Sequence, residues 1–145
     1  MHVRPGMEIK AQADWDKSKE NLEVCRMATD RQYFNAAASR YYYALRLAAQ
    51  ALFETRGVYS NDPRGPSYWG HSDLVQETVR LLSIGGHSSI DADRWLNEAR
   101  TLRNRGDYKL LDVHKDEIDY LVKNSVGLFE VIENEIASRG KTAGA

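Results

Sequence analysis

The sequence predicts an all-α protein, an antiparallel bundle of four main helices plus a shorter helix. Three observations support this fold class. Apolar residues recur three and four positions apart, most clearly over residues 34–52 and 118–136, which is the spacing of one helix face. No segment shows the apolar–polar alternation of a strand. The three prolines lie at positions 5, 63 and 66, so long intervals contain no proline to break a helix.

The predicted domain spans residues 12–138, between a flexible lead-in at 1–11 and a frayed tail at 139–145. Its first helix covers about residues 12–28. The apolar positions expected to face the core are Trp15, Leu22, Val24 and Cys25. Because Cys25 is the single cysteine of the chain, a disulfide framework is excluded, and we interpret this thiol as a small core side chain.

A long central helix follows, because Thr29 and Gln32 form a capping-box pattern with Thr29 as the N-cap. Its apolar positions alternate steps of four and three, and nothing breaks it before Gly57: Phe34, Ala38, Tyr41, Leu45, Ala48 and Leu52. Residues 57–71 then form a loop that is long for a compact domain. Two interpretations stay open, a lid or partner contact and an ordered strap whose Trp69 plugs the end of the bundle.

The remaining helices are predicted at about residues 72–82, 91–105 and 112–138. Gly106 suits the position just after a helix end, and Asp112 suits an N-cap. The positions expected to face the core are Leu74, Val75, Val79 and Leu82 in the first of these helices, Trp95, Leu96, Ala99 and Leu102 in the second, and Ile118, Leu121, Val122, Ser125, Leu128, Ile132 and Ile136 in the third.

Composition and charge limit the possible functions. The formal net charge is −1, so nucleic-acid binding would depend on a local patch and not on a global basic field. No apolar run resembles a signal peptide or is long enough to span a membrane, and we expect a cytoplasmic protein without membrane contact. The four histidines never fall at a metal-ligand spacing, and no phosphate-binding glycine loop is present. No metal and no cofactor are therefore predicted.

The segment RTLRNRGDY, residues 100–108, is the main candidate site. On a helix, Arg100 and Arg103 would share one face. A planar guanidinium presents paired donors that match phosphate oxygens, and Asn104 would add a neutral donor. Moving a proton needs a group that titrates near neutrality, whereas the ordinary pKa of a tyrosine such as Tyr108 is about 10. The alternative is a helix end whose arginines complement the helix dipole and pair with nearby acids.

A second candidate is Arg40, within the segment AASRYYYALRLAAQAL at residues 37–52. A charge on such an apolar, tyrosine-rich surface costs free energy unless it is paired. Either Arg40 pairs with a carboxylate in the core, with the tyrosines as packing, or it points into a cleft beside the segment RTLRNRGDY and binds phosphate there.

These segments resemble the small prokaryotic HEPN domains, from about residue 12 to residue 138. The resemblance includes the HSDLV segment at 71–75, and its most specific matches are Arg40-Tyr41-Tyr42 with Ala44, and Arg100, Arg103, Asp107 and Tyr108. The resemblance implies a helical bundle that dimerises with the arginine motif of each protomer near the shared interface. Many HEPN proteins are metal-independent ribonucleases, and many of those are toxins encoded beside a small nucleotidyltransferase-fold antitoxin.

In the mechanism that the resemblance implies, an RNA 2′-hydroxyl attacks its own phosphate, an arginine stabilises the developing charge, and a histidine moves the proton. Arg103 and Asn104 match the start of that motif, whereas Tyr108 stands where the histidine would fall. His71 would be the missing base if the fold brought it beside Arg103.

Three functions follow from the resemblance. The first is a non-catalytic or weakly active protein that binds RNA or nucleotide phosphate through Arg103, Arg100 and Arg40, together with a nucleotidyltransferase-type partner. The second is a metal-independent endoribonuclease toxin with Arg103 and Asn104 as catalytic residues and Tyr108 or His71 as the proton-transfer group. The third is a purely structural helical dimer.

Overall fold

The computed structural model describes residues 8–108 and 111–143, with side chains up to residue 138. Over these ranges the chain forms five α-helices and no strand, which confirms the predicted fold class. They are α1 (Ile9–Asp30), α2 (Phe34–Thr55), α3 (His71–Ile84), α4 (Ala92–Tyr108) and α5 (Lys115–Ala143). Most of the predicted lead-in, residues 1–7, and the last two tail positions, 144–145, lie outside the described residues.

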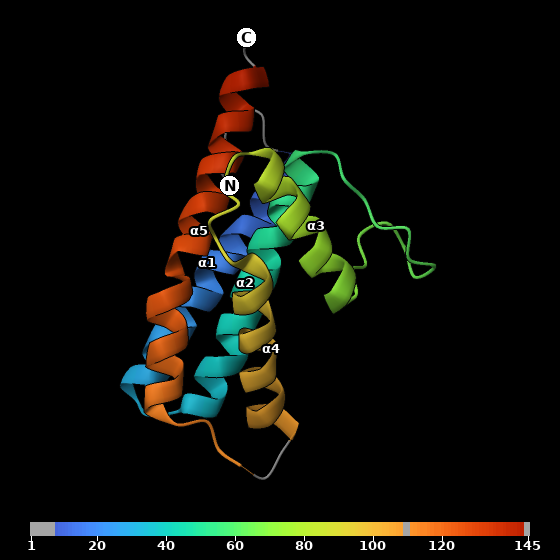
Figure 1. Ribbon diagram of the computed structural model, residues 1–145. Helices are drawn as coiled ribbons and strands as arrows, with labels where there is room; N and C mark the ends of the chain where they lie inside the picture. The colour runs from blue at the N-terminus through green and yellow to red at the C-terminus, as the bar shows by residue number, and fades with distance from the viewer. Residues whose placement is uncertain (1–7, 109–110, 144–145) are drawn as a thin grey trace.

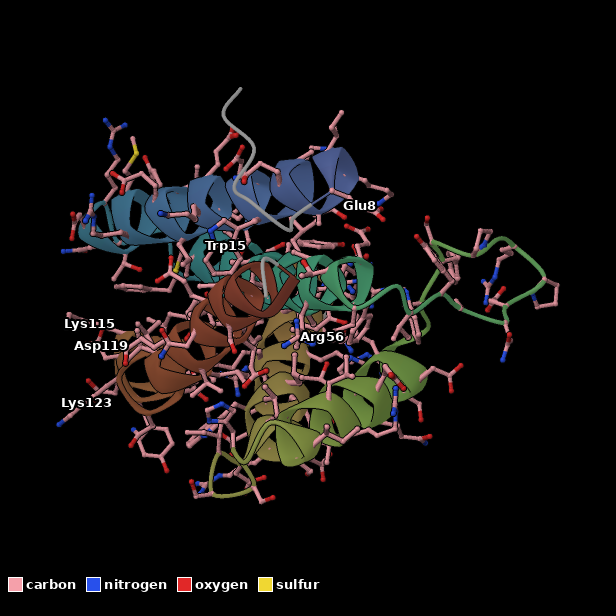
Figure 2. All side chains as sticks on the ribbon, turned by 90° about the horizontal axis from the view of Figure 1, so that it is seen from above. Glu8, Trp15, Arg56, Lys115, Asp119 and Lys123 are labelled. Carbon is pink, nitrogen blue, oxygen red and sulfur yellow. The ribbon has the colours of Figure 1, made fainter. Side chains whose placement is uncertain are left out.

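Four of the helices run along the long axis of the bundle, and the shorter α3 is inclined against its side (Figure 1). Helix α2 lies at the centre, in contact with α1, α3, α4 and α5. Seen along the bundle, α1 covers one side of α2 while α3 and α4 cover the other (Figure 2). None of the described helices is long and apolar enough to cross a membrane.

The central position of α2 follows from its small side chains. Six alanines have no exposed surface and let the neighbouring helices approach closely: Ala37, Ala38, Ala44, Ala48, Ala49 and Ala51. Between them Tyr41, Leu45, Leu52 and Phe53 fill the core. The predicted apolar stripe of this helix is confirmed, as is the buried position of Cys25, whose pKa is raised to about 11 by burial.

The predicted core face of α5 is also confirmed. Six predicted positions are buried: Ile118, Leu121, Ser125, Leu128, Ile132 and Ile136. The predicted Val122 is partly buried, and Phe129 is buried in addition. The polar member, Ser125, is accommodated because its hydroxyl bonds to both the Leu121 carbonyl and the Tyr41 hydroxyl.

The turn between α1 and α2 differs from the predicted capping box. The Thr29 hydroxyl donates to the Cys25 carbonyl one turn back (2.8 Å), so Thr29 belongs to α1 and does not cap α2. Helix α1 ends in a Schellman motif, in which the Gln32 N–H bonds to the Thr29 carbonyl (3.0 Å) and the Tyr33 N–H bonds to the Ala28 carbonyl (2.8 Å). Gln32 adopts φ +65°, the left-handed conformation that this motif requires.

Gly106 does not follow the end of α4, as predicted, but lies inside the helix. The reason is packing, because α4 passes the start of α2 at this point. A Cβ atom on Gly106 would lie 3.2 Å from Asn35 Cα. The absence of a side chain therefore permits the two backbones to approach closely.

The predicted N-cap of α5, Asp112, was also wrong. Its carboxylate accepts a hydrogen bond from the Asn35 amide (3.0 Å) and so ties the α4–α5 connection to α2. Helix α5 begins three residues later, and there the Glu117 carboxylate accepts the His114 backbone N–H (3.0 Å). This contact is one half of a capping box.

Two valines predicted to face the core, Val24 and Val79, are exposed by 39% and 38%. In α3 the neighbouring Thr78 is buried instead, and its hydroxyl donates to the Leu74 carbonyl (2.7 Å). A threonine can face the core of a helix when its hydroxyl bonds to the backbone one turn back.

The loop between α2 and α3 projects from the bundle and returns to it (Figure 1). At its base Trp69 is 8% exposed and packs its ring 4.6 Å from that of Phe53. Further out, the Ser60 N–H bonds to the Pro66 carbonyl (2.8 Å). Trp69 thus fixes the end of the loop to the core, while the outer part carries the exposed Tyr59 and Tyr68.

Candidate functional site

Arg103 reaches from α4 to α2, where its guanidinium lies among three tyrosine rings. The distances from its Cζ atom to the ring centroids are 5.8 Å for Tyr42, 5.3 Å for Tyr43 and 5.1 Å for Tyr108. One terminal nitrogen donates to the hydroxyls of Tyr43 (2.7 Å) and Tyr108 (3.2 Å). Position 108 is therefore beside the guanidinium, where a proton-transfer group would have to be.

Residues of its own helix also hold Arg103 in place. Its NH1 nitrogen donates to Asn104 Oδ1 (3.1 Å), and its Nε atom lies 3.2 Å from Asp107 Oδ2. The Asp107 contact is an ion pair and not a well-aligned hydrogen bond, since Nε lacks a hydrogen-bond partner. Ser39 of α2 donates to the same carboxylate (3.4 Å). The arginine is thus preorganised, with 18% of its side chain exposed.

Arg100 lies one turn before Arg103 on α4 and is exposed. Within the described part of the chain, its guanidinium has no hydrogen-bond or ion-pair partner. Its charge acts on His71, whose pKa it helps to lower. Arg100 and Arg103 are therefore neighbouring cations on one helix face, as their spacing predicts. Among the described residues, Arg103 is held by several partners and Arg100 by none.

Arg40, predicted either for the core or for a cleft beside Arg103, lies elsewhere. It is exposed, and its contact is with the Asn21 amide oxygen of α1 (3.4 Å). Position 40 shares a helix face with Ala44, whose carbonyl accepts a hydrogen bond from Ser18 of α1. That face is turned toward α1, whereas Arg103 approaches α2 from the side of α4.

His71, the first residue of α3, connects three helices. Its Nδ1 atom lies 2.9 Å from the Tyr42 hydroxyl of α2, and its Nε2 atom lies 2.8 Å from Asn97 Oδ1 of α4. Asn97 in turn donates to Asp93 Oδ1 (2.6 Å). Because Tyr42 also borders Arg103, the fold brings His71 and Arg103 to the same tyrosine side chain.

The surroundings of His71 favour its neutral form. Burial lowers the pKa of the imidazole, and the charges of Arg100 and Arg46 lower it further. The Asn97 hydrogen bond and the Asp93 charge act in the opposite direction. His71 is therefore uncharged at neutral pH, the state in which a histidine can accept a proton.

We call these residues the arginine–tyrosine cluster: Tyr42, Tyr43, Arg46, His71, Arg100, Arg103 and Tyr108. Sequence reasoning missed Tyr43 and Arg46, as well as Asn97 beside the cluster. Arg46 donates to the Tyr42 hydroxyl (3.4 Å) and to the Trp69 carbonyl. The positions 42 and 46, and 93, 97 and 100, follow helical spacing, which was the one signal that could have identified them.

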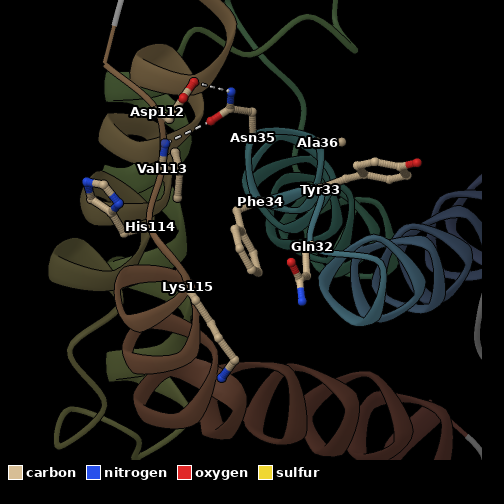
Figure 3. Close-up of a pocket in the computed structure, with 9 residues that line it drawn as sticks. All are labelled: Gln32, Tyr33, Phe34, Asn35, Ala36, Asp112, Val113, His114 and Lys115. Atoms are coloured by element: carbon tan, nitrogen blue, oxygen red, sulfur yellow. Dashed lines mark hydrogen bonds between the residues drawn. The ribbon is translucent and has the colours of Figure 1, made fainter.

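A hollow of about 600 Å³ lies at the end of the bundle where α2 and α5 begin, between the α1–α2 turn and the start of α5. Figure 3 shows the Asn35 side chain holding its wall together, by a bond to Asp112 and by the bond that it accepts from the Val113 N–H (2.8 Å). Tyr33, 62% exposed, and Leu111, 72% exposed, belong to this end of the molecule. Here the protein presents apolar surface close to the C-terminal end of α4.

The fold and the site define an all-helical bundle in which an arginine–tyrosine cluster joins α2, α3 and α4. No family model matches the chain. It is 27% identical over 104 residues to the UPF0332 protein glr0978 of Gloeobacter violaceus, an alignment that covers 72% of this chain and 76% of the relative. It is 22% identical over 108 residues to MJ0142 of Methanocaldococcus jannaschii, which is named as a candidate toxin, with 74% and 68% of the two chains covered.

Proposed function

We propose that this protein is a HEPN-type RNA-binding protein that grips RNA phosphate with Arg103 and Arg100 and is non-catalytic or weakly active by itself. The observation that carries the proposal is the braced guanidinium of Arg103 with the free guanidinium of Arg100 one turn away. Neighbouring guanidinium groups match the phosphates of a nucleic-acid backbone.

Charge supports the proposal. The chain as a whole carries a formal net charge of −1, yet the arginine–tyrosine cluster contains three arginines. The nearby carboxylates are those of Asp93 and Asp107. A local cationic patch of this kind is what a protein without a global basic field needs to bind RNA.

The tyrosines support single-stranded RNA in particular. Tyr108 is 72% exposed beside Arg103, so its ring face is available to a base. Stacking of bases on aromatic rings next to a phosphate-binding arginine is typical of single-strand recognition. A phosphate would also replace the neutral Tyr43 and Tyr108 hydroxyls as acceptors of Arg103, and charge-assisted hydrogen bonds are the stronger ones.

The experiment is a fluorescence-anisotropy titration of the full chain with a short labelled single-stranded RNA of mixed sequence. We expect Arg103→Ala to weaken binding at least about tenfold, and the slope of log affinity against log salt to fall by about 0.7 for the lost contact. Arg94→Ala is the matched control, because Arg94 lies on the same helix but pairs with Glu98 (3.1 Å). Equal binding by the wild type and Arg103→Ala would refute the proposal.

We also propose that the protein forms a homodimer through the end of the bundle that carries Tyr33 and Leu111, and that its further partner is a nucleotidyltransferase-type antitoxin. Exposed aromatic and aliphatic side chains beside an arginine are the composition that interfaces favour. The name of the Methanocaldococcus jannaschii relative supports a toxin-type partnership. Light scattering at micromolar concentration should give a dimer mass, and a monomer mass would contradict the homodimer.

The second candidate function is a metal-independent endoribonuclease. It is favoured by the Tyr108 hydroxyl, which lies 3.2 Å from Arg103, because a histidine at position 108 would lie beside the same guanidinium. Tyr108→His should then raise cleavage of the same RNA in the presence of EDTA, with 2′,3′-cyclic phosphate ends. If Tyr108→His binds RNA as the wild type does and gains no cleavage, position 108 is not the place of a proton-transfer group, and if the wild type also leaves the RNA intact in EDTA, this candidate function is wrong.

A further inference from the structure

Helices α4 and α5 run side by side along the bundle (Figure 1), and a groove of about 400 Å³ lies between them. Its apolar lining comes from Leu102 of α4 and from Leu121 and Tyr120 of α5. The Tyr120 side chain is 49% exposed, and the ring of Trp95 lies next to it, with the two ring centroids 6.2 Å apart. The groove therefore offers an apolar and aromatic surface to a ligand from solution.

The groove belongs to a different face of α4 from the arginine–tyrosine cluster. The residues of α4 that line it are Glu98, Thr101, Leu102 and Arg105. By contrast, Asp93, Asn97 and Arg100, which surround His71, follow another row of this helix. The groove is thus a second surface, and the proposed RNA binding does not account for it.

Side-chain bridges close the groove at both ends. At one end Arg94 of α4 donates to the Tyr120 hydroxyl of α5 (2.8 Å), and at the other Arg105 of α4 pairs with Glu117 of α5. The two arginines are separated by about three helical turns. A partner helix laid along the groove would meet both bridges, whereas a short ligand fits between them. The volume of about 400 Å³ also lies in the usual range of small-molecule sites.

The charges at the rim favour a cation. Of the described residues that line the groove, three carry a carboxylate and one carries a guanidinium. Arg105 already pairs with Glu117, whereas Asp116 is exposed and has no hydrogen-bond or ion-pair partner among the described residues. Glu98 lies one turn from Arg94, and Asp116 is next to Glu117. One carboxylate is therefore near each end of the groove.

Arg94 shows how this rim holds a cation. Its Cζ atom lies 4.5 Å from the centroid of the Trp95 ring, its Nε atom donates to Glu98 (3.1 Å), and a terminal nitrogen donates to Tyr120. A carboxylate next to an aromatic face attracts an organic cation through both charge and the ring electrons. The groove repeats this combination, with a carboxylate near each end and apolar side chains between.

We propose that the groove between α4 and α5 is a binding site for a linear aliphatic polyamine. One ammonium group pairs with Glu98 and a second pairs with Asp116, while the methylene chain between them lies against Leu102 and Tyr120. A monoamine lacks the second charge, and an inorganic cation lacks the apolar part, so both bind less tightly. The site is independent of the proposed RNA binding.

The test is isothermal titration calorimetry of the full chain with spermidine, at physiological salt and without RNA. We expect a single site whose affinity for spermidine is at least about tenfold higher than for butylamine, which carries one ammonium group. Glu98→Gln and Asp116→Asn should each weaken spermidine binding about fivefold, because each removes one ion pair. Glu130→Gln, at an exposed position of α5, is the matched control and should bind as the wild type does.

Three results would overturn the proposal. The first is unchanged spermidine affinity in both Glu98→Gln and Asp116→Asn, with melting temperatures equal to that of the wild type. The second is displacement of spermidine by an equal concentration of Mg²⁺, because a compact dication competes equally only at a diffuse acidic surface. The third is absence of binding at millimolar spermidine, which would leave a basic segment of a partner protein as the occupant. None of these results would affect RNA binding through Arg103.

Discussion

The two halves of α2 carry polar clusters of different character. In the second half, cations meet carboxylates: Lys10 with Glu54 (2.6 Å) and Asp14 (3.0 Å), and Arg56 and His87 with Glu135 (2.6 and 2.8 Å). We call this group the ion-pair cluster. In the first half, the arginine–tyrosine cluster supplies its cations mainly with hydroxyl, amide and carbonyl oxygens, and Arg100 has no such partner among the described residues.

The kind of oxygen that holds the cations indicates which cluster stabilises the fold and which can bind an anionic ligand. Where carboxylates neutralise cations within a partly buried group, the charges serve the packing of the helices, and removing one partner leaves an uncompensated charge. Where neutral oxygens hold the cations, the group is ordered but its positive potential remains. Stability should therefore depend on the ion-pair cluster, and the proposed RNA binding on the arginine–tyrosine cluster.

The largest expected effect on stability is that of Glu135→Ala. Glu135 of α5 pairs with Arg56 at the end of α2 and with His87 in the α3–α4 connection, and its side chain is 15% exposed. Its loss leaves Arg56 without a carboxylate. We expect about 2 kcal/mol of destabilisation, or a melting temperature about 4–8 °C lower, with unchanged affinity for RNA.

The matched control is Glu130→Ala, an exposed glutamate on the same helix, which should change the melting temperature little. Weaker RNA binding by folded Glu135→Ala would contradict the division between the two clusters. Equal stability of Glu135→Ala and Glu130→Ala would contradict the structural role of the ion-pair cluster.

The fold was predictable because its signal is local. The apolar stripes of α2 and α5 lie within single helices, and burial of those faces drives their packing. The errors fell where tertiary contacts decide. Gly106 continues α4 because Asn35 of another helix lies against it, and the Thr29 hydroxyl turned back to α1 in preference to capping α2.

The part of the candidate site that lies on α4 was predictable for the same reason, whereas the part that joins different helices was not. Arg100, Arg103, Asn104 and Tyr108 lie on one helix, so their spacing brings them together without knowledge of the fold. The contact between Tyr42 and His71 joins residues far apart in sequence, and only the arrangement of α2, α3 and α4 produces it. Phosphate binding by Arg100 and Arg103 and a catalytic role of Tyr108 or His71 remain predictions.

A smaller effect is expected from pH through Glu54 in the ion-pair cluster. Burial raises the pKa of its carboxyl to about 7, with a further rise from Asp14, while Lys10 opposes the shift. Because the folded pKa lies above the unfolded one, the stabilisation is complete below about pH 4.5 and is lost as pH rises through 7. Between about pH 5 and pH 8 we expect the wild type to lose about 1–2 kcal/mol more than Glu54→Gln does.

Urea unfolding of both proteins at the two pH values measures this difference. Glu20→Gln, at an exposed position of α1, is the control and should follow the wild type. His71 acts in the opposite direction, because its lowered pKa costs stability as pH falls, but it is common to all three proteins and cancels from the comparison. Parallel curves for wild type and Glu54→Gln would show that this carboxyl titrates normally.

The smallest expected effect is at Gln32, in the turn that lies outside both clusters. A side chain in the left-handed region costs about 1 kcal/mol, which glycine does not pay, although glycine is also more flexible in the unfolded chain. Gln32 is exposed at φ +65°, so Gln32→Gly should raise the free energy of unfolding by about 0.5–1 kcal/mol. Gln32→Ala keeps the unfavourable conformation and should show no gain. Chemical denaturation of the three proteins decides this, and equal stability of the glycine and alanine variants would contradict it. RNA affinity should stay unchanged in both variants, because the strain relieved in this turn belongs to the end of α1 and not to the side chains that hold Arg103.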